Sequence, residues 1–155
     1  MISNSEKQTK KIAQELIEKY KNYLEEKCLI LALEGDLGTG KTVFAKGAAE
    51  ALGIKKVIRS PSFIIMREFP YALRTSKGKF YHLDLWRMES EKEILSLRIR
   101  DLIKPENILV IEWAEKMAKL WPKILNRQKN LLVKIEIKSV GRSKREIEIR
   151  NWGRG

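Results

Sequence analysis

One eight-residue stretch, Gly35-Asp36-Leu37-Gly38-Thr39-Gly40-Lys41-Thr42, constrains this chain more than any other part of its sequence. Its spacing is that of G-x-x-x-x-G-K-[ST], the Walker A phosphate-binding loop. The three glycines permit backbone conformations that a Cβ would forbid, so several amides can point at one phosphate. Lys41 adds a mobile positive charge for the β- and γ-phosphates, and the Thr42 hydroxyl can hold Mg²⁺. The stretch therefore predicts a loop whose residues, together with the adjoining Val43, bind a nucleotide.

The segments that flank this loop fit a strand entering it and a helix leaving it. Residues 28–33 form a continuous apolar run, as expected of a strand that is buried on both faces. Residues 43–52 are rich in alanine, and Gly53 follows where a helix would end. A chance glycine-rich turn requires neither flank, so we favour the phosphate-binding loop.

The composition is that of a globular protein with an unusual net charge. The 155 residues suit one domain over 1–155. No apolar run approaches the roughly 20 residues that span a bilayer, and residues 1–8 lack a signal-peptide core, so we expect a cytoplasmic protein without a membrane partner. The single cysteine, Cys28, excludes an internal disulfide and is expected in the core. The net charge of +12 suits an anionic partner such as RNA or ATP, but identifies neither.

Hydrophobic periodicity predicts the other elements of an α/β fold. The first is a helix from the capping box Ser5-x-x-Gln8 to about residue 27, and strands over 63–69 and 79–86 with a loop at 73–78 come after the phosphate-binding loop and its helix. A helix over 89–97, a loop to Pro105, a strand over 108–111 and a helix over 114–120 that Trp121-Pro122 ends come next. The last elements are strands over 131–138 and 144–150 with a turn at 140–143. This order predicts a three-layer sandwich of the P-loop NTPase type. Its central sheet is mostly parallel, with an antiparallel edge hairpin.

Two polar side chains interrupt the strand over 79–86. Alternation places His82 and Asp84 on the same face as Phe80 and Trp86. For His82, the only histidine, we favour a hydrogen-bonded structural role. Asp84 stands near the end of the strand, where a carboxylate can support the Mg²⁺ shell or position water.

A second carboxylate, Glu112, follows the apolar residues 108–111, which is the pattern of a Walker B strand. Ligands of open α/β sheets gather at the carboxyl ends of the strands, so Glu112 is expected beside Thr42. The alternative role of Glu112 is that of a first-turn acid for the helix over 114–120. We favour the metal role, because a Walker A loop requires such a partner.

The tetrapeptide Ser60-Pro61-Ser62-Phe63 lies between the loop and the first of the paired strands. Pro61 fixes an extended turn, and Ser62 offers a hydroxyl near the position of a switch segment. An ordinary Ser-Pro turn is the alternative interpretation of this tetrapeptide.

Four motifs in order give the chain a family resemblance. They are the Walker A loop, Ser60-Pro61-Ser62-Phe63, His82-Leu83-Asp84-Leu85-Trp86-Arg87 and Ile111-Glu112-Trp113. This set resembles the bacterial TsaE (YjeE) family, the ATPase of tRNA threonylcarbamoyladenosine biosynthesis. The resemblance implies a P-loop fold that binds ATP with Mg²⁺, metal contacts at Thr42 and Glu112, and an important acidic role for Asp84. It also implies two partner proteins that install the modification on the adenosine beside the anticodon, with tRNA contacted directly or through the complex.

The resemblance extends from Thr9 to Arg145, and it implies that these two residues contact adenine. The chain departs from the family pattern at two positions, with Ser62 in place of threonine and Trp86 in place of tyrosine. Serine keeps the hydroxyl, whereas Trp86 lacks the phenol. With Lys41 and Asp84, Ser62 is therefore a candidate catalytic residue.

Two other classes of function share parts of this pattern. A small P-loop kinase needs an acceptor pocket and an arginine-bearing lid, and the candidate insert near residues 74–79 is short. A non-catalytic RNA-binding module explains the net charge but not a full Walker A loop with two strand-end carboxylates. For an ATPase, Arg59, Arg67 and Arg87 are the candidate arginine fingers. Because none is fixed over the loop by its sequence, we expect weak hydrolysis that partners activate.

Overall fold

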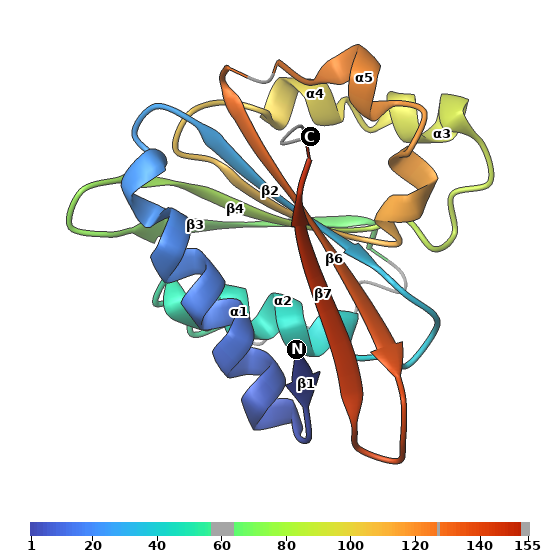
Figure 1. Ribbon diagram of the computed structural model, residues 1–155. Helices are drawn as coiled ribbons and strands as arrows, with labels where there is room; N and C mark the ends of the chain where they lie inside the picture. Colours follow the sequence, from blue (N-terminus) through green and yellow to red (C-terminus); the bar gives the residue numbers. More distant parts are fainter. Residues whose placement is uncertain (57–63, 127, 153–155) are drawn as a thin grey trace.

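A mixed sheet of seven strands runs through the residues that the computed structural model describes, which are 1–56, 64–126 and 128–152. The strand order is β1-β7-β6-β2-β5-β4-β3 (Figure 1). Four central strands run parallel: β6 (Asn130–Ser139), β2 (Cys28–Glu34), β5 (Ile108–Glu112) and β4 (Lys77–Asp84). On one side, β3 (Met66–Ala72) pairs antiparallel with β4; on the other, β7 (Arg145–Asn151) pairs antiparallel with β6, and β1 (Ile2–Ser3) antiparallel with β7. The predicted α/β fold with a mostly parallel sheet is confirmed.

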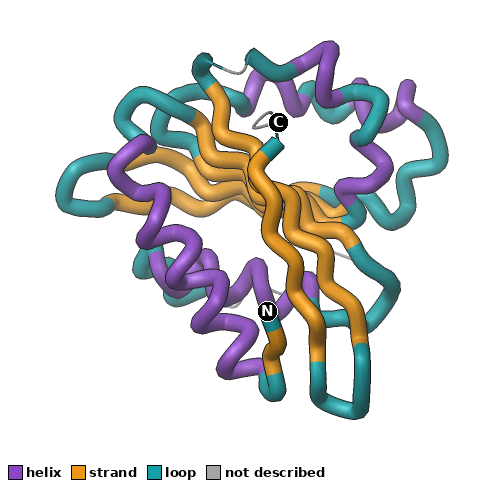
Figure 2. The backbone as a smooth tube through the Cα atoms, in the orientation of Figure 1, coloured by secondary structure: helices purple, strands orange, loops and turns teal. Residues whose placement is uncertain are grey.

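Helices cover both faces of this sheet, so β2 is buried on each side. Its residues Leu29, Leu31 and Leu33 pack in the core beneath α1 (Glu6–Tyr20) and α2 (Lys41–Ala51). The alternate residues, among them Ile30 and the fully buried Cys28, belong to the core of the opposite face. Short helices cover that face: α3 (Glu91–Ser96), α4 (Ile99–Leu102), the 3₁₀ helix η2 (Ala114–Met117) and α5 (Trp121–Ile124). Figure 2 shows the resulting layer of strands between two layers of helices.

Parallel pairing brings three carboxyl-terminal strand ends to one edge of the sheet. Leu33 at the end of β2 is the register partner of Glu112 in β5, and Glu112 is the partner of Asp84 in β4. Since the Walker A loop follows β2 directly, the loop and the two carboxylates lie at the same edge. This is the edge where open α/β sheets bind their ligands.

The predicted first helix was too long. The α-helix ends at Tyr20, and a 3₁₀ turn, η1 (Lys21–Tyr23), follows it. The reason is competition for the backbone bonds beyond this point: the Leu24 carbonyl accepts from the amide of Glu106, and the Cys28 amide donates to Lys129. Bonds to neighbouring strand ends thus replace the helical ladder, although Leu24 itself is buried.

Two helical segments on the opposite face also differ from the prediction. The expected loop before Pro105 contains the one-turn helix α4, separated from α3 by Arg98 at a positive φ of 53°. The expected helix over 114–120 is a 3₁₀ turn, and Trp121-Pro122 begins α5 instead of ending a helix. Proline suits the first turn of a helix, because the amide that it lacks has no partner there.

The two predicted strand pairs are confirmed with shifted bounds. Phe63 lies outside the described residues; β3 begins at Met66, and the turn that joins it to β4 spans 73–76. In β4, Phe80 and Tyr81 lie in the cores of opposite faces, as alternation predicts. The hairpin of β6 and β7 forms as expected, and the two residues of β1 pair with its outer strand.

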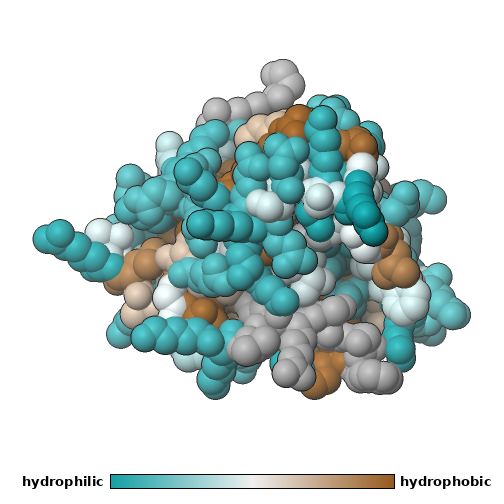
Figure 3. Space-filling model, turned by 90° about the horizontal axis from the view of Figure 1, so that it is seen from below, coloured by the Kyte–Doolittle hydropathy of each residue, from teal (hydrophilic) through white to brown (hydrophobic). Residues whose placement is uncertain are grey.

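Polar side chains cover most of the outer surface of α1 and α2, the face that Figure 3 presents from below. Small apolar patches interrupt it there without joining into one large area. In the described part of the chain, no helix has the length and apolar character that crossing a membrane requires.

Candidate functional site

Two glycines of the Walker A loop lie against neighbouring groups, Gly35 against backbone and Gly40 against a side chain. Gly35 has a φ of +141°, and a Cβ at this position would lie 2.2 Å from the carbonyl oxygen of Ile137 in β6. Gly40 has a φ of +109°, and its Cβ would lie 2.7 Å from Nε of Arg145. A residue with a Cβ would have strained dihedrals at both positions; at Gly35 it would also clash with the backbone of β6, and at Gly40 it would displace the Arg145 side chain.

Arg145, the first residue of β7, reaches the loop from two strands away in the sheet. Its Nε donates to the carbonyl of Thr39 at 2.8 Å, and the Thr39 hydroxyl donates to the carbonyl of Asp36 at 3.0 Å. The C-terminal hairpin therefore supports the loop directly.

The Lys41 side chain is almost completely buried, with 4% of its surface exposed. Its ammonium donates to the carbonyls of Gly35 and Asp36 at 2.5 and 2.6 Å, and lies over the ring of Trp113, 4.2 Å from the centroid. Burial lowers the pKa of this ammonium from its ordinary value of 10.5, and the carboxylate of Glu112 is the largest opposing influence. A positive charge is thus held inside the cleft beside the loop amides.

Thr42 and Glu112 meet at the first turn of α2, as the sequence predicts. The Thr42 hydroxyl donates to both carboxylate oxygens of Glu112, Oε1 at 2.9 Å and Oε2 at 3.2 Å. His82 approaches from β4, with its Nε2 2.6 Å from Oε2. The predicted hydrogen-bonded role of His82 is confirmed, and its partner is the candidate metal carboxylate.

Asp84 ends β4 next to Glu112 and stabilises the loop that follows. Its Oδ1 accepts the backbone amide of Trp86 at 2.9 Å. Lys116, from η2, donates to the carbonyls of Trp86 at 2.5 Å and of Met88 at 2.9 Å. The loop after β4 is therefore fixed from both sides, by Asp84 and by Lys116.

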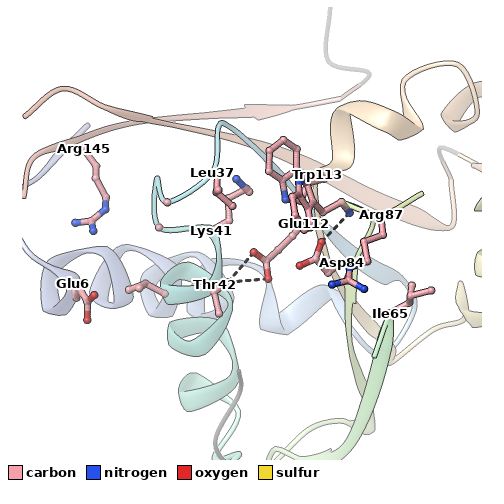
Figure 4. A pocket seen from close by; sticks show the side chains of 14 residues that line it. Glu6, Leu37, Lys41, Thr42, Ile65, Asp84, Arg87, Glu112, Trp113 and Arg145 are labelled. Atoms are coloured by element: carbon pink, nitrogen blue, oxygen red, sulfur yellow. Dashed lines mark hydrogen bonds between the residues drawn. The ribbon is translucent and has the colours of Figure 1, made fainter. Parts of the chain in front are cut away.

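A cleft of about 490 Å³ joins these groups, which is within the range of small-molecule sites. Figure 4 shows Arg145 and Glu6 at one end of it, Asp84, Ile65 and Arg87 at the other, and Lys41 with Thr42 between them. The lining residues are Glu6, Leu37, Gly38, Gly40, Lys41, Thr42, Val43, Ile65, Asp84, Trp86, Arg87, Glu112, Trp113 and Arg145. One elongated cleft is thus lined by residues of the Walker A loop and by both carboxylates, Asp84 and Glu112.

Some predicted site residues lie elsewhere or outside the described residues. Thr9 is buried in α1, where its hydroxyl contacts the hydroxyl of Ser3 at 2.7 Å and the carbonyl of Ser5 at 3.2 Å. The lining of the cleft comes from Glu6, one turn earlier, and does not include Thr9 among the described residues. Ser62 falls in the range 57–63, outside the described part of the chain.

The three arginines proposed as fingers have different positions. Arg87 lines the cleft. Arg67 lies in β3 as the register partner of His82 and is not among the described lining residues. Arg59 lies in the range that the structure does not describe. Of the two described arginines, Arg87 is therefore the one placed at the cleft.

Sequence reasoning missed three contributors to the site. Glu6 and Ile65 line the cleft, and Lys116 anchors the loop after β4. An acidic residue in a first helical turn and a lysine in a charged segment are too common to single out. For Lys116, the available signal was the spacing Trp113-x-x-Lys116 after the Walker B carboxylate. This spacing places Lys116 on the same turn as Trp113, and hence near the site.

The donor groups at the centre of the cleft fit a hard cation such as Mg²⁺. Thr42 and Glu112 offer oxygen atoms only, and the described residues contain no cluster of three or more acidic, histidine or cysteine ligands. Mg²⁺ usually takes one or two protein oxygens and completes its shell with phosphates and water. The arrangement suits a metal that arrives with a phosphate ligand.

Comparison with known proteins decides the family. The family model described as "Threonylcarbamoyl adenosine biosynthesis protein TsaE" matches residues 3–147. The chain belongs to the TsaE family. Two relatives bear the name "tRNA threonylcarbamoyladenosine biosynthesis protein TsaE". The one from Bacillus subtilis is 39% identical over 76% of this chain and 66% of its own length. The one from Aquifex aeolicus is 31% identical over 96% of this chain and 93% of its own length.

The relative of the same name from Haemophilus influenzae is 35% identical over 63% of this chain and 59% of its own length. The chain thus spans less than two thirds of the length of the relatives from Bacillus subtilis and Haemophilus influenzae. The crystal structure of Bacillus subtilis YdiB matches 99% of this chain and 84% of its own, with a TM-score of 0.62 and 29% identity. This agreement in fold over nearly the whole chain supports the TsaE assignment that the sequence motifs predict.

Proposed function

We propose that this chain binds ATP together with Mg²⁺ in the cleft and hydrolyses it in the service of tRNA threonylcarbamoyladenosine synthesis. The observation that carries the proposal is the bond between Thr42, at the end of the Walker A loop, and Glu112, at the end of β5. In P-loop NTPases this pair of positions holds the metal that accompanies the phosphates. The names of the TsaE relatives supply the biological context.

Each group in the cleft then has a defined task. The amides of the loop and the Lys41 ammonium bind the β- and γ-phosphates, and Arg145 keeps the loop in place through Thr39. Thr42 and Glu112 hold Mg²⁺, which when bound neutralises charge on the phosphate oxygens. Asp84, one strand away from Glu112, orients the attacking water or the loop after β4.

Positive charge beyond Lys41 is needed for fast hydrolysis, because a finger-type arginine contributes about 10³- to 10⁵-fold. Arg87 is the described candidate, at the end of the cleft near Asp84. We therefore expect slow hydrolysis by the isolated chain, and activation by the cytoplasmic partner proteins and tRNA of the modification machinery.

A small-molecule kinase is less favoured by the fold. The turn over 73–76, the candidate lid insert, lies at the start of β4, whereas the cleft adjoins the end of β4 at Asp84. The turn is also closed by a bond from the Leu73 amide to the Ser76 carbonyl at 2.7 Å. The turn is therefore poorly placed to close over the cleft as the lid of a kinase.

The test compares Lys41→Ala with Lys46→Ala, which removes the same charge from the same helix outside the cleft. Because hydrogen bonds to charged groups contribute about 1.5–3 kcal/mol, Lys41→Ala should weaken ATP binding about 10- to 100-fold by calorimetry and leave adenosine binding unchanged. Lys46→Ala should match the wild type. Unchanged ATP affinity in a folded Lys41→Ala protein would overturn the site.

A second measurement tests the role in tRNA modification. Phosphate release and threonylcarbamoyladenosine formation are measured with and without the reconstituted partner proteins and tRNA. Both should rise together with the wild type and fail with Lys41→Ala. Equal modification without a competent chain would reject the biological role while leaving the ATP site intact. Binding of tRNA that ignores Lys41→Ala, without any hydrolysis, would instead support the RNA-binding module.

A further inference from the structure

His82 is a fully buried polar residue in the middle of the sheet. Its side chain has no exposed surface, and β4 lies between β3 and β5. Phe80, two residues earlier on the same face, belongs to the apolar core. A buried imidazole costs free energy unless it is hydrogen-bonded, and a valine or leucine would pack here at no such cost. The position therefore calls for a partner that needs the imidazole.

That partner is Glu112, which is 3% exposed. The carboxylate has two described neighbours that approach from different elements: Thr42 from α2 and His82 from β4. Oε2 takes the shorter contact, 2.6 Å from Nε2 of His82, whereas Oε1 has its shortest contact, 2.9 Å, with the Thr42 hydroxyl. These contacts, together with the longer one of 3.2 Å from the Thr42 hydroxyl to Oε2, hold the carboxylate from two elements.

We propose that His82 is a positioning residue for the metal site, whose Nε2–H holds Oε2 of Glu112 so that Oε1 stays directed at Thr42. This inference rests on the proposed function, because it concerns the same Mg²⁺–ATP site. Hydrogen bonds from outside the ligand shell orient metal-binding side chains, and their loss typically reduces metal affinity about 10- to 100-fold. His82 acts through Glu112 and does not contact the nucleotide.

The surroundings of the ring specify where its hydrogen lies. Glu112 accepts from Thr42 and can accept from Nε2, so the His82 hydrogen belongs on Nε2. The other ring nitrogen, Nδ1, is buried and has no hydrogen-bond partner among the described residues. A hydrogen on Nδ1 alone would leave a buried donor unpaired and place two acceptors, Nε2 and the carboxylate, against each other.

The first experiment measures ATP affinity by calorimetry with Mg²⁺ and with EDTA, for the wild type, His82→Phe and His82→Gln. Phenylalanine fills the space without a donor, whereas the glutamine amide can place an N–H near the position of Nε2. In His82→Phe we expect the ratio of ATP affinity with Mg²⁺ to ATP affinity with EDTA to fall about 10- to 100-fold. The affinity in EDTA itself should not change. His82→Gln should restore part of the Mg²⁺ effect.

Phe80→Leu is the matched control, a change in the core of the same strand and face that leaves the carboxylate alone. A purely structural role of His82 would lower the melting temperature of His82→Phe and preserve the Mg²⁺ effect, which would overturn the inference. A wild type that binds ATP without any Mg²⁺ effect would overturn the metal part of the proposed function and this inference together. A wild type without ATP binding would reject both at the first step.

The second experiment needs no variant of His82 to fold. Since His82 is the only histidine, the ¹⁵N–¹H spectrum of the imidazole comes from one ring. We expect the hydrogen on Nε2, and a shift of its resonance in Glu112→Gln and on addition of Mg²⁺ with ATP. A hydrogen on Nδ1 with a bare Nε2, or a resonance indifferent to Glu112→Gln, would overturn the proposed contact whatever the ATP measurements give.

Discussion

The ammonium of Lys41 lies over the indole of Trp113, 4.2 Å from the centre of the ring. Trp113 directly follows Glu112 and has a positive φ of 59°, at the point where β5 has ended and η2 begins. The residue after β5 thus contacts the first residue of α2. Lys41 and Glu112, the proposed phosphate and metal residues, are thus linked through one tryptophan.

Removal of this ring should weaken nucleotide binding through Lys41. A cation–π contact contributes about 0.5–2 kcal/mol, so Trp113→Leu should lower ATP affinity roughly 2- to 30-fold. A double-mutant cycle with Lys41→Met isolates the coupling, because the effect of Trp113→Leu should largely vanish when the ammonium is absent. Fully additive calorimetric effects of the two substitutions would contradict the coupling.

The two carboxylates should separate into binding and turnover. Glu112→Gln keeps the size of the side chain but weakens the metal contact, so it should remove most of the Mg²⁺-dependent gain in ATP affinity. Asp84→Asn should lower kcat more than affinity, because it acts on the attacking water or its loop. Calorimetry and partner-stimulated phosphate release measure the two effects. If Asp84→Asn lost the Mg²⁺ effect and Glu112→Gln kept it, the roles would be exchanged.

Lys116→Met should loosen the loop after β4 without unfolding the chain. The substitution removes two charge-assisted bonds, to the carbonyls of Trp86 and Met88. We expect faster hydrogen exchange at residues 85–88 and a several-fold lower kcat, with a loss of stability of about 1–3 kcal/mol. Lys119→Met, an exposed lysine three residues on, is the control. Equal exchange rates in the two variants would argue against the anchoring role.

As the pH rises, the affinity for ATP should begin to decrease at a lower pH than the ordinary pKa of a lysine would give. In the proposed function the ammonium of Lys41 is the form that binds phosphate, and burial lowers its pKa below 10.5 in the free chain. Bound phosphate favours the ammonium and raises that pKa, so above the lowered value binding must take up a proton and weakens as the pH rises. Calorimetry in buffers of different ionisation enthalpy measures this uptake. Lys41→Arg should abolish it, and a flat affinity up to pH 10.5 would contradict the prediction.

The centre of the site could be predicted because its parts carry strong local signals. The Walker A spacing identifies the loop around Lys41, and an apolar run that ends in a carboxylate identifies Glu112. The rule that ligands gather at strand ends then places Glu112 beside Thr42, where the structure has it. The hydrogen bond of His82 was predictable from burial, but its partner stands 30 positions away on another strand.

The periphery of the site could not be predicted, because it depends on tertiary contacts with weak local signals. Lys116 resembles any surface lysine until the fold brings two carbonyls of another loop to it. The end of the first helix was also predicted wrongly, since the amide of Glu106 takes the carbonyl of Leu24. Thr9 and Ser62 remain predictions, one now placed behind Glu6 and the other outside the described residues.

The bond from Arg145 to the carbonyl of Thr39 joins residues 106 positions apart. During synthesis on the ribosome, the Walker A loop emerges long before the arginine that supports it, and β7 is joined to β2 only through β6. A growing chain therefore has the complete phosphate-binding motif without its tertiary support. We therefore expect full ATP affinity only after the last strand, β7, has joined the sheet. ATP binding by a nascent chain would then indicate that the fold is complete, and not only that the Walker A motif has been synthesised.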